Sequence, residues 1–334
     1  MQKYNYFCYF CNLWTKEMYN LTIEKRTMKR LFVALAAFGL AAAVATAQDF
    51  KTAVETFNAG ATALETNKTE ALAQFRAAMA EAALCEGDEA ADLVAKCKEI
   101  IPGTLLSIAK EQINDGNYDS ALATLEEVKA VAAEYEAAPV AEEVAELIPN
   151  VYLRKGSTLL KAKDFAGAAA ALKELTAIDP ENGQAQLLLG QALLQGGDTE
   201  GAVAALDKAN VLGEAQAPKL LSTTYLKKGQ ALLKAGKNAE AIEALEKSNS
   251  YVESGNAYKL IASAQTKSGK SALAINAYKK YLEVTPNAKD AADIMFTIAA
   301  TAQKAGDKAT AKEYYQKLAG TKYADQAQVQ LKAL

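Results

Sequence analysis

The chain of 334 residues contains no histidine, one tryptophan, four cysteines and six prolines. Histidine titrates nearest neutral pH and is the commonest metal ligand, so its absence excludes the catalytic triads and zinc sites that depend on it. Runs of β-branched residues around Asn-Gly or Asp-Gly turns, which signal β-hairpins, are missing as well. These absences favour a chain that has neither a sheet nor histidine-dependent chemistry.

Helix-forming residues dominate what is present. Alanine, leucine, lysine and glutamate are abundant, 51% of the residues are hydrophobic and 23% are charged. The 37 basic and 40 acidic residues nearly balance, so there is no basic footprint for nucleic acid. We therefore predict an all-α protein, whose length fits either two globular domains or one long array of repeats.

The segment 28–47 is typical of a secretory signal peptide. Lys29 and Arg30 precede an apolar stretch, and small residues end the segment just before Gln48. The apolar stretch is shorter than the roughly 20 residues that span a bilayer, which favours cleavage between Ala47 and Gln48 over a membrane anchor. We expect an exported, periplasmic or envelope-associated protein without stable membrane insertion. Residues 1–27 precede the signal, and we interpret them as a spurious upstream extension that leaves Met1 or Met28 open as the true start.

Three segments, 156–172, 190–206 and 229–245, share one pattern. Each begins with glycine and has leucines three and four residues after it. An alanine follows twelve residues after the glycine, and a further leucine lies four residues after that alanine. This spacing predicts two antiparallel helices, with the alanine and leucine on one face of the second helix. Equivalent pairs, here called anchor pairs, are Ala71/Phe75, Ala121/Leu125, Ala168/Leu172, Ala202/Leu206, Ala241/Leu245, Ala274/Tyr278 and Ala311/Tyr315.

This pattern resembles the tetratricopeptide repeat, which has a small residue in its first helix and an alanine followed by a large residue in its second. The resemblance implies a right-handed α–α superhelix, a tetratricopeptide solenoid, of about seven helix pairs. It covers most of residues 50–320, and residues 321–334 are predicted to form a helix that caps the last apolar face.

The first two anchor spacings, of 50 and 47 residues, exceed a helix pair by about one helix. The additional stretches, 88–102 and 137–149, are both acidic and both end in Ile-Pro. We predict extra helices there, with Pro102 and Pro149 opening the helix that follows. The array would then divide into variant units over 48–148 and regular repeats over 149–320.

Two cysteine pairs suggest chemistry that the sequence does not support. Cys8 and Cys11 have Cys-x-x-Cys spacing but lie upstream of the signal. Cys85 and Cys97 would lie about 12 Å apart along a helix axis, whereas a disulfide needs Cα atoms within about 7 Å. We therefore expect Cys85 and Cys97 to be buried thiols.

The resemblance implies a concave groove lined mainly by the first helix of each pair. Its candidate residues are Leu153, Ser157, Leu160, Leu187, Gln191, Leu194, Leu226, Gln230, Leu233, Lys259, Ser263 and Lys267. Such a mixture suits an extended peptide or a partner helix. An equally weighted alternative is that these leucines pack against neighbouring helices.

We predict a protein-interaction scaffold of the bacterial cell envelope, not an enzyme, with an unidentified protein or peptide partner. No motif for a cofactor, metal or small-molecule substrate stands out, and Gly269-Lys270-Ser271 lacks the strand and upstream glycine of a phosphate loop. The alternatives are a structural envelope spacer without a dedicated partner and, less favoured, an enzyme with an unrecognised site.

Overall fold

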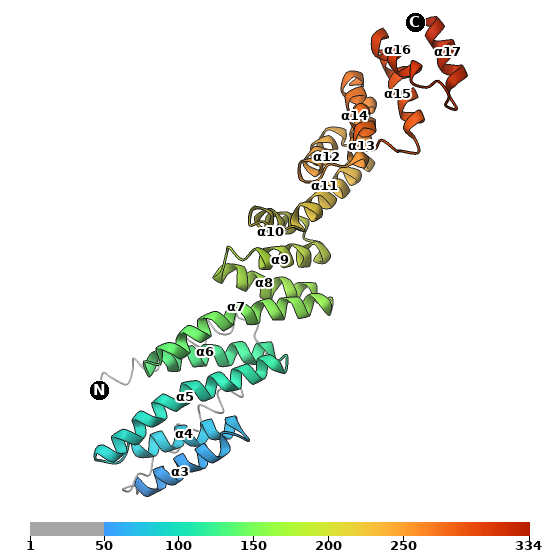
Figure 1. Cartoon of the computed structure of the whole chain (residues 1–334). Helices are drawn as coiled ribbons and strands as arrows, with labels where there is room; N and C mark the ends of the chain where they lie inside the picture. The colour runs from blue at the N-terminus through green and yellow to red at the C-terminus, as the bar shows by residue number, and fades with distance from the viewer. Residues whose placement is uncertain (1–49) are drawn as a thin grey trace, which may run out of the picture. The chain divides into compact units, whose positions relative to one another are not determined.

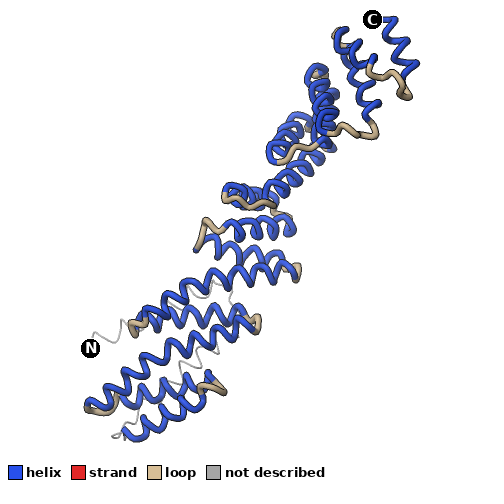
Figure 2. Tube along the Cα trace, viewed as in Figure 1, coloured by secondary structure: helices blue, strands red, loops and turns tan. Residues whose placement is uncertain are grey.

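The computed structural model describes residues 50–334, and this part of the chain forms fifteen helices and no strand (Figures 1 and 2). The helices are α3 (Phe50–Ala63), α4 (Lys68–Ala82), α5 (Asp88–Asn114), α6 (Tyr118–Glu134), α7 (Ala138–Lys161), α8 (Phe165–Ile178), α9 (Gly183–Gly196), α10 (Thr199–Val211), α11 (Ala217–Lys234), α12 (Asn238–Tyr251), α13 (Gly255–Lys267), α14 (Ser271–Val284), α15 (Ala291–Lys304), α16 (Lys308–Gln316) and α17 (Ala324–Ala333). The predicted signal peptide, the upstream extension and the Cys8/Cys11 pair lie outside the described residues. Over the part described, no helix is both long enough and apolar enough to cross a membrane.

The described residues belong to two compact units. One contains the described residues up to Ile108 together with Val131–Ala137, and the other contains Ala109–Ala130 and Ala138–Leu334. In the second unit each helix from α7 to α17 packs against the next one in sequence. First helices also touch across pairs, α7 with α9 and α11 with α13, so part of the array presents adjoining first helices.

Short polar turns close the helix pairs. After α9, Gly197 adopts a left-handed conformation (φ 90°), which glycine accepts without steric cost, and so ends the helix. Asp198 then caps α10, its Oδ1 accepting a hydrogen bond from the Gly201 amide at 2.9 Å. The chain thus reverses within two residues, and the two helices pack side by side.

The seven anchor pairs lie in the second helices α4, α6, α8, α10, α12, α14 and α16, as the spacing predicts. Every anchor alanine is fully buried, and the large residue of each pair is at most 8% exposed. The predicted all-α tetratricopeptide-repeat solenoid of seven helix pairs is therefore confirmed over the described residues. Each expected second helix is present and buries its expected face.

The glycine of each central repeat sits against the large residue of its own anchor pair. A Cβ at Gly190 would lie 2.5 Å from Leu206 Cγ, and one at Gly156 would lie 2.5 Å from Leu172 Cγ. The same position in the last two pairs is alanine, at Ala262 and Ala299, where the anchor residue is tyrosine. Ala109 holds this position opposite the leucine anchor Leu125 in the α5–α6 pair, so the close approach of glycine and leucine is a feature of the central repeats.

The predicted extra helices are wrong as separate elements. Residues 88–102 and 138–149 are helical, but they continue without a break into the first helix of the next pair, giving α5 and α7 with Pro102 and Pro149 inside them. The proposed domain boundary at residue 149 therefore falls within a helix. A proline removes one helical hydrogen bond and crowds the preceding turn, but it does not end a helix whose two halves both bury apolar residues. Ile101 and Leu105 of α5, and Val144 and Val151 of α7, are such residues.

Burial differs between the two described cysteines. Cys97 is fully buried, and this burial raises the pKa of its thiol to about 11. Cys85 follows α4 and is only half-buried, with Sγ 3.5 Å from the Glu81 carbonyl oxygen. The prediction of buried thiols is correct for Cys97 and wrong for Cys85, because Cys85 lies in the turn after the helix rather than on its buried face.

Aromatic residues pack around the end of the array. Phe296 of α15 stacks on Tyr323, with ring centroids 4.7 Å apart, and meets the edge of Tyr315 at 5.9 Å. Tyr323 precedes α17, whose Ala327 is buried. Tyr323 thus covers the ring of Phe296, which would otherwise face solvent at the end of the array.

Candidate functional site

The twelve residues predicted for the groove all lie on first helices. On α7 they are Leu153, Ser157 and Leu160; on α9, Leu187, Gln191 and Leu194; on α11, Leu226, Gln230 and Leu233; and on α13, Lys259, Ser263 and Lys267. Lys267 is exposed, Leu187 is buried, and the other ten are half-buried. The structure therefore places them along successive first helices.

The leucines of this set take part in packing between helices. Leu153 and Leu160 lie against the cluster of buried residues that contains Leu172. Leu187 is itself a member of the next cluster, and Leu226 and Leu233 border the cluster that contains Leu245. Most of the apolar surface of these leucines is therefore used inside the repeat array.

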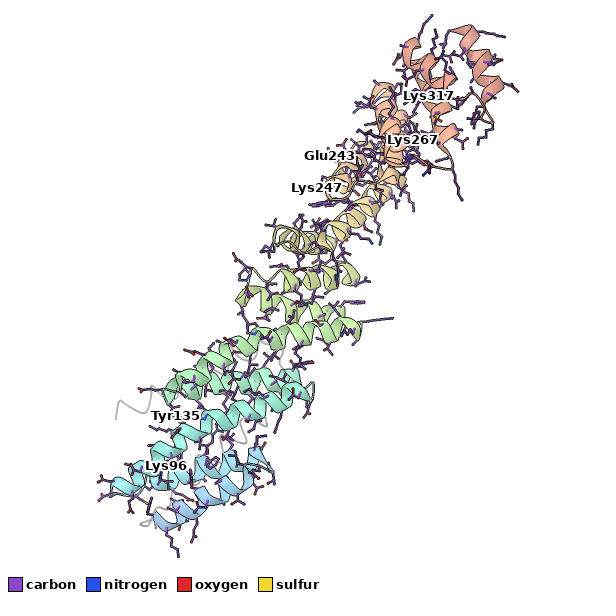
Figure 3. The ribbon with its side chains drawn as sticks, viewed as in Figure 1. Lys96, Tyr135, Glu243, Lys247, Lys267 and Lys317 are labelled. Carbon is purple, nitrogen blue, oxygen red and sulfur yellow. The ribbon has the colours of Figure 1, made fainter. Side chains whose placement is uncertain are left out.

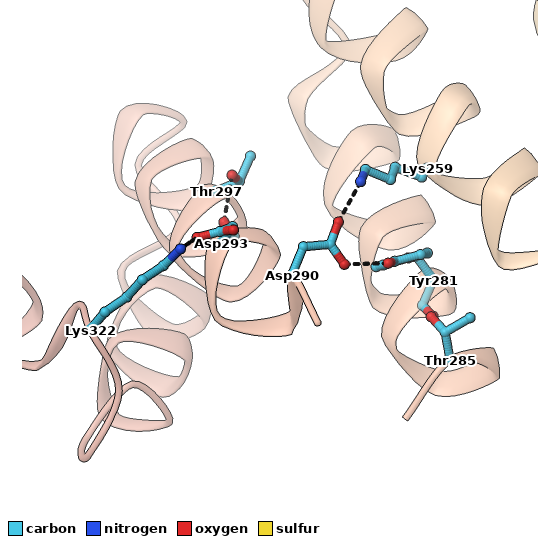
Figure 4. Close-up of polar contacts among 7 residues, drawn as sticks. All are labelled: Lys259, Tyr281, Thr285, Asp290, Asp293, Thr297 and Lys322. Carbon is cyan, nitrogen blue, oxygen red and sulfur yellow. Dashed lines mark hydrogen bonds and ion pairs between the residues drawn. The ribbon is translucent and has the colours of Figure 1, made fainter. Parts of the chain in front are cut away.

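Lys259 is engaged within the chain. Its ammonium group pairs with Asp290, which precedes α15 and also accepts a hydrogen bond from the Tyr281 hydroxyl at 2.5 Å (Figure 4). These two bonds, with Lys259 the larger contributor, hold the pKa of the Asp290 carboxyl below its usual range. Asp293 makes a comparable pair with Lys322 at 2.5 Å. Lys259 thus ties α13 to the start of the next helix pair.

A cavity of about 610 Å³ opens between α9, α10 and α11. Its lining residues are Leu194, Gln195, Thr199, Glu200, Leu220, Thr223, Thr224, Lys227 and Lys228. Leu194 belongs to the predicted set, while the other eight do not. The prediction followed residues at fixed positions of the first helices, whereas this cavity lies where the start of a second helix meets the following first helix.

A second cavity, of about 630 Å³, has a corresponding position in the first unit. It lies between the α3–α4 turn and α5, and its residues include Phe57, Lys68 and Thr104. Lys96 lines it as well, and Figure 3 shows this side chain on α5. Both cavities border the first residue of a second helix, Lys68 in α4 and Thr199 in α10.

Charge is divided between first and second helices in the central repeats. α9 has no charged residue, while α11 and α13 have no carboxylate and carry Lys219, Lys227, Lys228, Lys234, Lys259 and Lys267. The second helices α10 and α12 carry Glu200, Asp207, Glu240, Glu243 and Glu246 beside Lys208 and Lys247. Figure 3 shows Lys267 on α13, and Glu243 and Lys247 on α12. A chain with a formal charge of −3 therefore presents six lysines and no acid on three first helices.

Among the described residues no group of three or more Cys, Asp or Glu is arranged to hold a metal ion. Asp290 and Asp293 owe their lowered pKa to hydrogen bonds with lysine and tyrosine. The polar groups gathered at the cavity of α9–α11 can bind charged and hydrogen-bonding groups.

Sequence models of the tetratricopeptide repeat match residues 159–211, 226–292 and 293–321. These matches begin within α7 and run through α16, the part of the chain in which anchor pairs and glycines recur most regularly. The chain carries tetratricopeptide repeats over residues 159–321. Repeats of this family generally mediate contacts with proteins or peptides, so the coarse assignment is a protein-interaction scaffold.

Several solved structures are similar to this chain. One is the crystal structure of MamA, 24% identical, covering 52% of this chain and 90% of that chain with a TM-score of 0.32. Another is the C-terminal part of a TPR repeat-containing protein from Cytophaga hutchinsonii, 17% identical over 66% of this chain and 82% of that chain, with a TM-score of 0.35. A third is YrrB, described as a TPR protein with an unusual peptide-binding site, 16% identical over 55% and 91%, with a TM-score of 0.31. No curated protein sequence matches the chain.

Proposed function

We propose that this protein is a non-catalytic interaction scaffold of the bacterial cell envelope. It binds a segment of a partner protein along the first helices α7 to α13. The observation that carries the proposal is the unequal charge of the central repeats, where the first helices α11 and α13 bear six lysines and no acid, and α11 borders an open cavity. A solvated surface with no binding role would not require this separation from the acidic second helices.

Export to the periplasm belongs to the same proposal. The basic residues at 29–30, the apolar stretch and the small residues before Gln48 support it. After cleavage the chain would carry 31 basic and 38 acidic residues, a formal charge of −7, because residues 1–47 hold six basic and two acidic ones. The lysine-bearing first helices then stand out even more against the rest of the chain.

The test is co-purification of the tagged full chain from its own cells. Gln191→Arg with Gln230→Arg places two bulky charges on half-buried positions of first helices, and should abolish recovery of a stoichiometric partner. Thr176→Arg with Ser250→Arg adds the same charges on the second helices α8 and α12, and should leave recovery unchanged. Loss in both variants, or in neither, would overturn the proposed face.

The second candidate, a structural spacer, is favoured by the packing of the groove leucines into the array. It predicts that no stoichiometric partner is recovered even with the unmodified chain. Far-ultraviolet circular dichroism on all variants separates loss of binding from loss of helix.

A further inference from the structure

The cavity between α9, α10 and α11 borders a position that holds an aromatic residue in α6 and α8 and threonine in α10; the other second helices begin with Lys68, Asn238, Ser271 and Lys308. The first residue of a second helix lies three positions before its anchor alanine. In α6 and α8 this residue is Tyr118 and Phe165, and in α10 it is Thr199. The three positions are equivalent by register, so their surroundings can be compared directly.

Where the aromatic residue is present, it fills the space against the next first helix. The Tyr118 hydroxyl lies 3.4 Å from Thr158 Oγ1 of α7, and the Arg154 guanidinium lies 6.0 Å from the Tyr118 ring centroid. A Cβ built on Gly196 of α9 would lie 3.8 Å from the Cβ of Phe165. Threonine is too short to reach across, and α10 leaves about 610 Å³ open at this place.

The charged residues around Tyr118 have counterparts around the empty place. Asp119 pairs with Lys155, which is adjacent to Arg154 on α7. By register, Glu200 takes the place of Asp119, Lys227 that of Arg154 and Lys228 that of Lys155, and all three line the cavity. An aspartate, an arginine and a lysine have thus become a glutamate and two lysines, while the ring of Tyr118 and the hydroxyl of Thr158 have no counterpart. The cavity therefore offers charged groups like those around Tyr118 without a ring between them.

We propose that this cavity receives the aromatic side chain of an acidic segment in the partner protein; the inference rests on the proposed function and specifies its ligand. The ring would lie between Leu194, Leu220 and the stem of Lys227, with the Lys227 ammonium over its face as Arg154 lies over Tyr118. A cavity of about 150 Å³ already accommodates benzene, so the volume is ample.

Phenylalanine fits the place at least as well as tyrosine. Thr158, which faces the Tyr118 hydroxyl, corresponds by register to Ala231 on α11, which offers no hydroxyl. Carboxylates on either side of the ring have complementary charge nearby, since α11 and α13 carry lysines and no acid. Glu200 is the only acidic residue lining the cavity. Its counterpart Asp119 forms an ion pair with Lys155, which corresponds by register to Lys228.

The test is fluorescence anisotropy of the full chain with a labelled peptide, Gly-Asp-Glu-Phe-Glu-Asp-Gly. The same peptide with alanine in place of phenylalanine should bind at least about five-fold more weakly, because the ring supplies the buried contact. A peptide with lysines in place of all four acids should not bind. Raising the salt concentration should weaken binding, since the contributing lysines are exposed.

Filling the cavity from within is the decisive variant. Thr199→Phe restores the residue that α8 carries at this position, so the fold tolerates it, and binding of the phenylalanine peptide should fall to the level of the alanine peptide. Asn238→Phe makes the same change at the first residue of α12 and should leave binding as in the unmodified chain. Lys227→Gln should weaken binding of the phenylalanine peptide more than binding of the alanine peptide.

Equal binding of the phenylalanine and alanine peptides, unchanged binding by Thr199→Phe, or no detectable peptide binding would each overturn the inference. The proposed function would survive these results if the co-purified partner is still lost on Gln191→Arg with Gln230→Arg. The proposed function is contradicted, independently of the peptide results, if those substitutions leave recovery of the partner unchanged.

Discussion

At the scale of single residues, the closeness of the two helices in a repeat depends on what faces the large anchor residue. In the central repeats this is a glycine with leucine above it, as at Gly190 and Leu206. The contact involves Leu206 Cγ, a branch point that cannot swing away as the end of a flexible side chain would. Tight packing of this kind leaves no room for one additional methyl group.

Gly190→Ala should therefore destabilise the chain by about 1 to 3 kcal/mol, since the added Cβ would lie 2.5 Å from Leu206 Cγ. Gly103→Ala is the matched control, because Gly103 also lies inside a helix but has nothing within 4 Å of its added Cβ. It should stabilise by about 0.5 to 1 kcal/mol through helix propensity. Urea unfolding measures both, and equal effects at the two sites would contradict the packing account.

Asp290 makes a pH-dependent contribution to stability. Its pKa in the folded chain lies below the unfolded value of about 3.9, because Lys259 and Tyr281 bind the carboxylate. The contribution is therefore present above about pH 4 and is lost as the pH falls through the folded pKa. Asp290→Asn should cost at most about 1 kcal/mol at pH 7, since the pair is partly exposed.

The measurement is the difference in unfolding free energy between the unmodified chain and Asp290→Asn, taken at neutral and at strongly acidic pH. The difference should shrink towards zero in acid, where the carboxylate of the unmodified chain becomes protonated. A difference that is constant or grows as the pH falls would show that the carboxylate does not stabilise the contact.

The anchor pairs and their glycines were predictable because their spacing is local: the alanine lies twelve positions after the glycine, and the large residue lies four positions after the alanine. The pairing of Lys259 with Asp290 was not, since the two residues are separated by 31 positions and meet only after two helices have packed. The sequence alone does not single out Thr199, because the second helices α4, α12, α14 and α16 also begin without an aromatic residue.

At the scale of elements, the two long helices α5 and α7 differ from the expected pattern. A proline within an amphipathic stretch is compatible with either a helix start or a helix interior. The outcome depends on whether both sides bury apolar residues against the same neighbours, and spacing along one chain does not contain that information. The length of the additional segments was predictable, while their continuity was not.

Pro149→Ala should raise stability by roughly 1 to 3 kcal/mol, because alanine restores the helical hydrogen bond that proline lacks in the interior of α7. Pro218→Ala serves as the control, since Pro218 lies in the first turn of α11, where its missing N–H has no helical partner. The unfolding midpoint in urea should rise for the first variant and change little for the second. A fall on Pro149→Ala would mean that the packing of α7 requires the proline.

At the scale of the whole molecule, a chain of net negative charge carries six lysines and no carboxylate on the first helices α11 and α13, whereas the second helices α10 and α12 carry five carboxylates and two lysines. Repeat arrays bury apolar surface between neighbouring units, and the outward faces are then available for recognition. The sequence shows the charges, but it is the alternation of first and second helices that assigns them to different faces. We interpret the first helices as the binding face on these grounds.

The most direct test of this face is site-specific photo-crosslinking in the producing cells. A photoreactive residue in place of Thr223, which lines the α9–α11 cavity, should give one discrete adduct with a partner protein. The same residue in place of Ser250 on the second helix α12 should give none. Adducts of equal yield from both positions, or from Ser250 alone, would contradict the assignment of the first helices as the binding face.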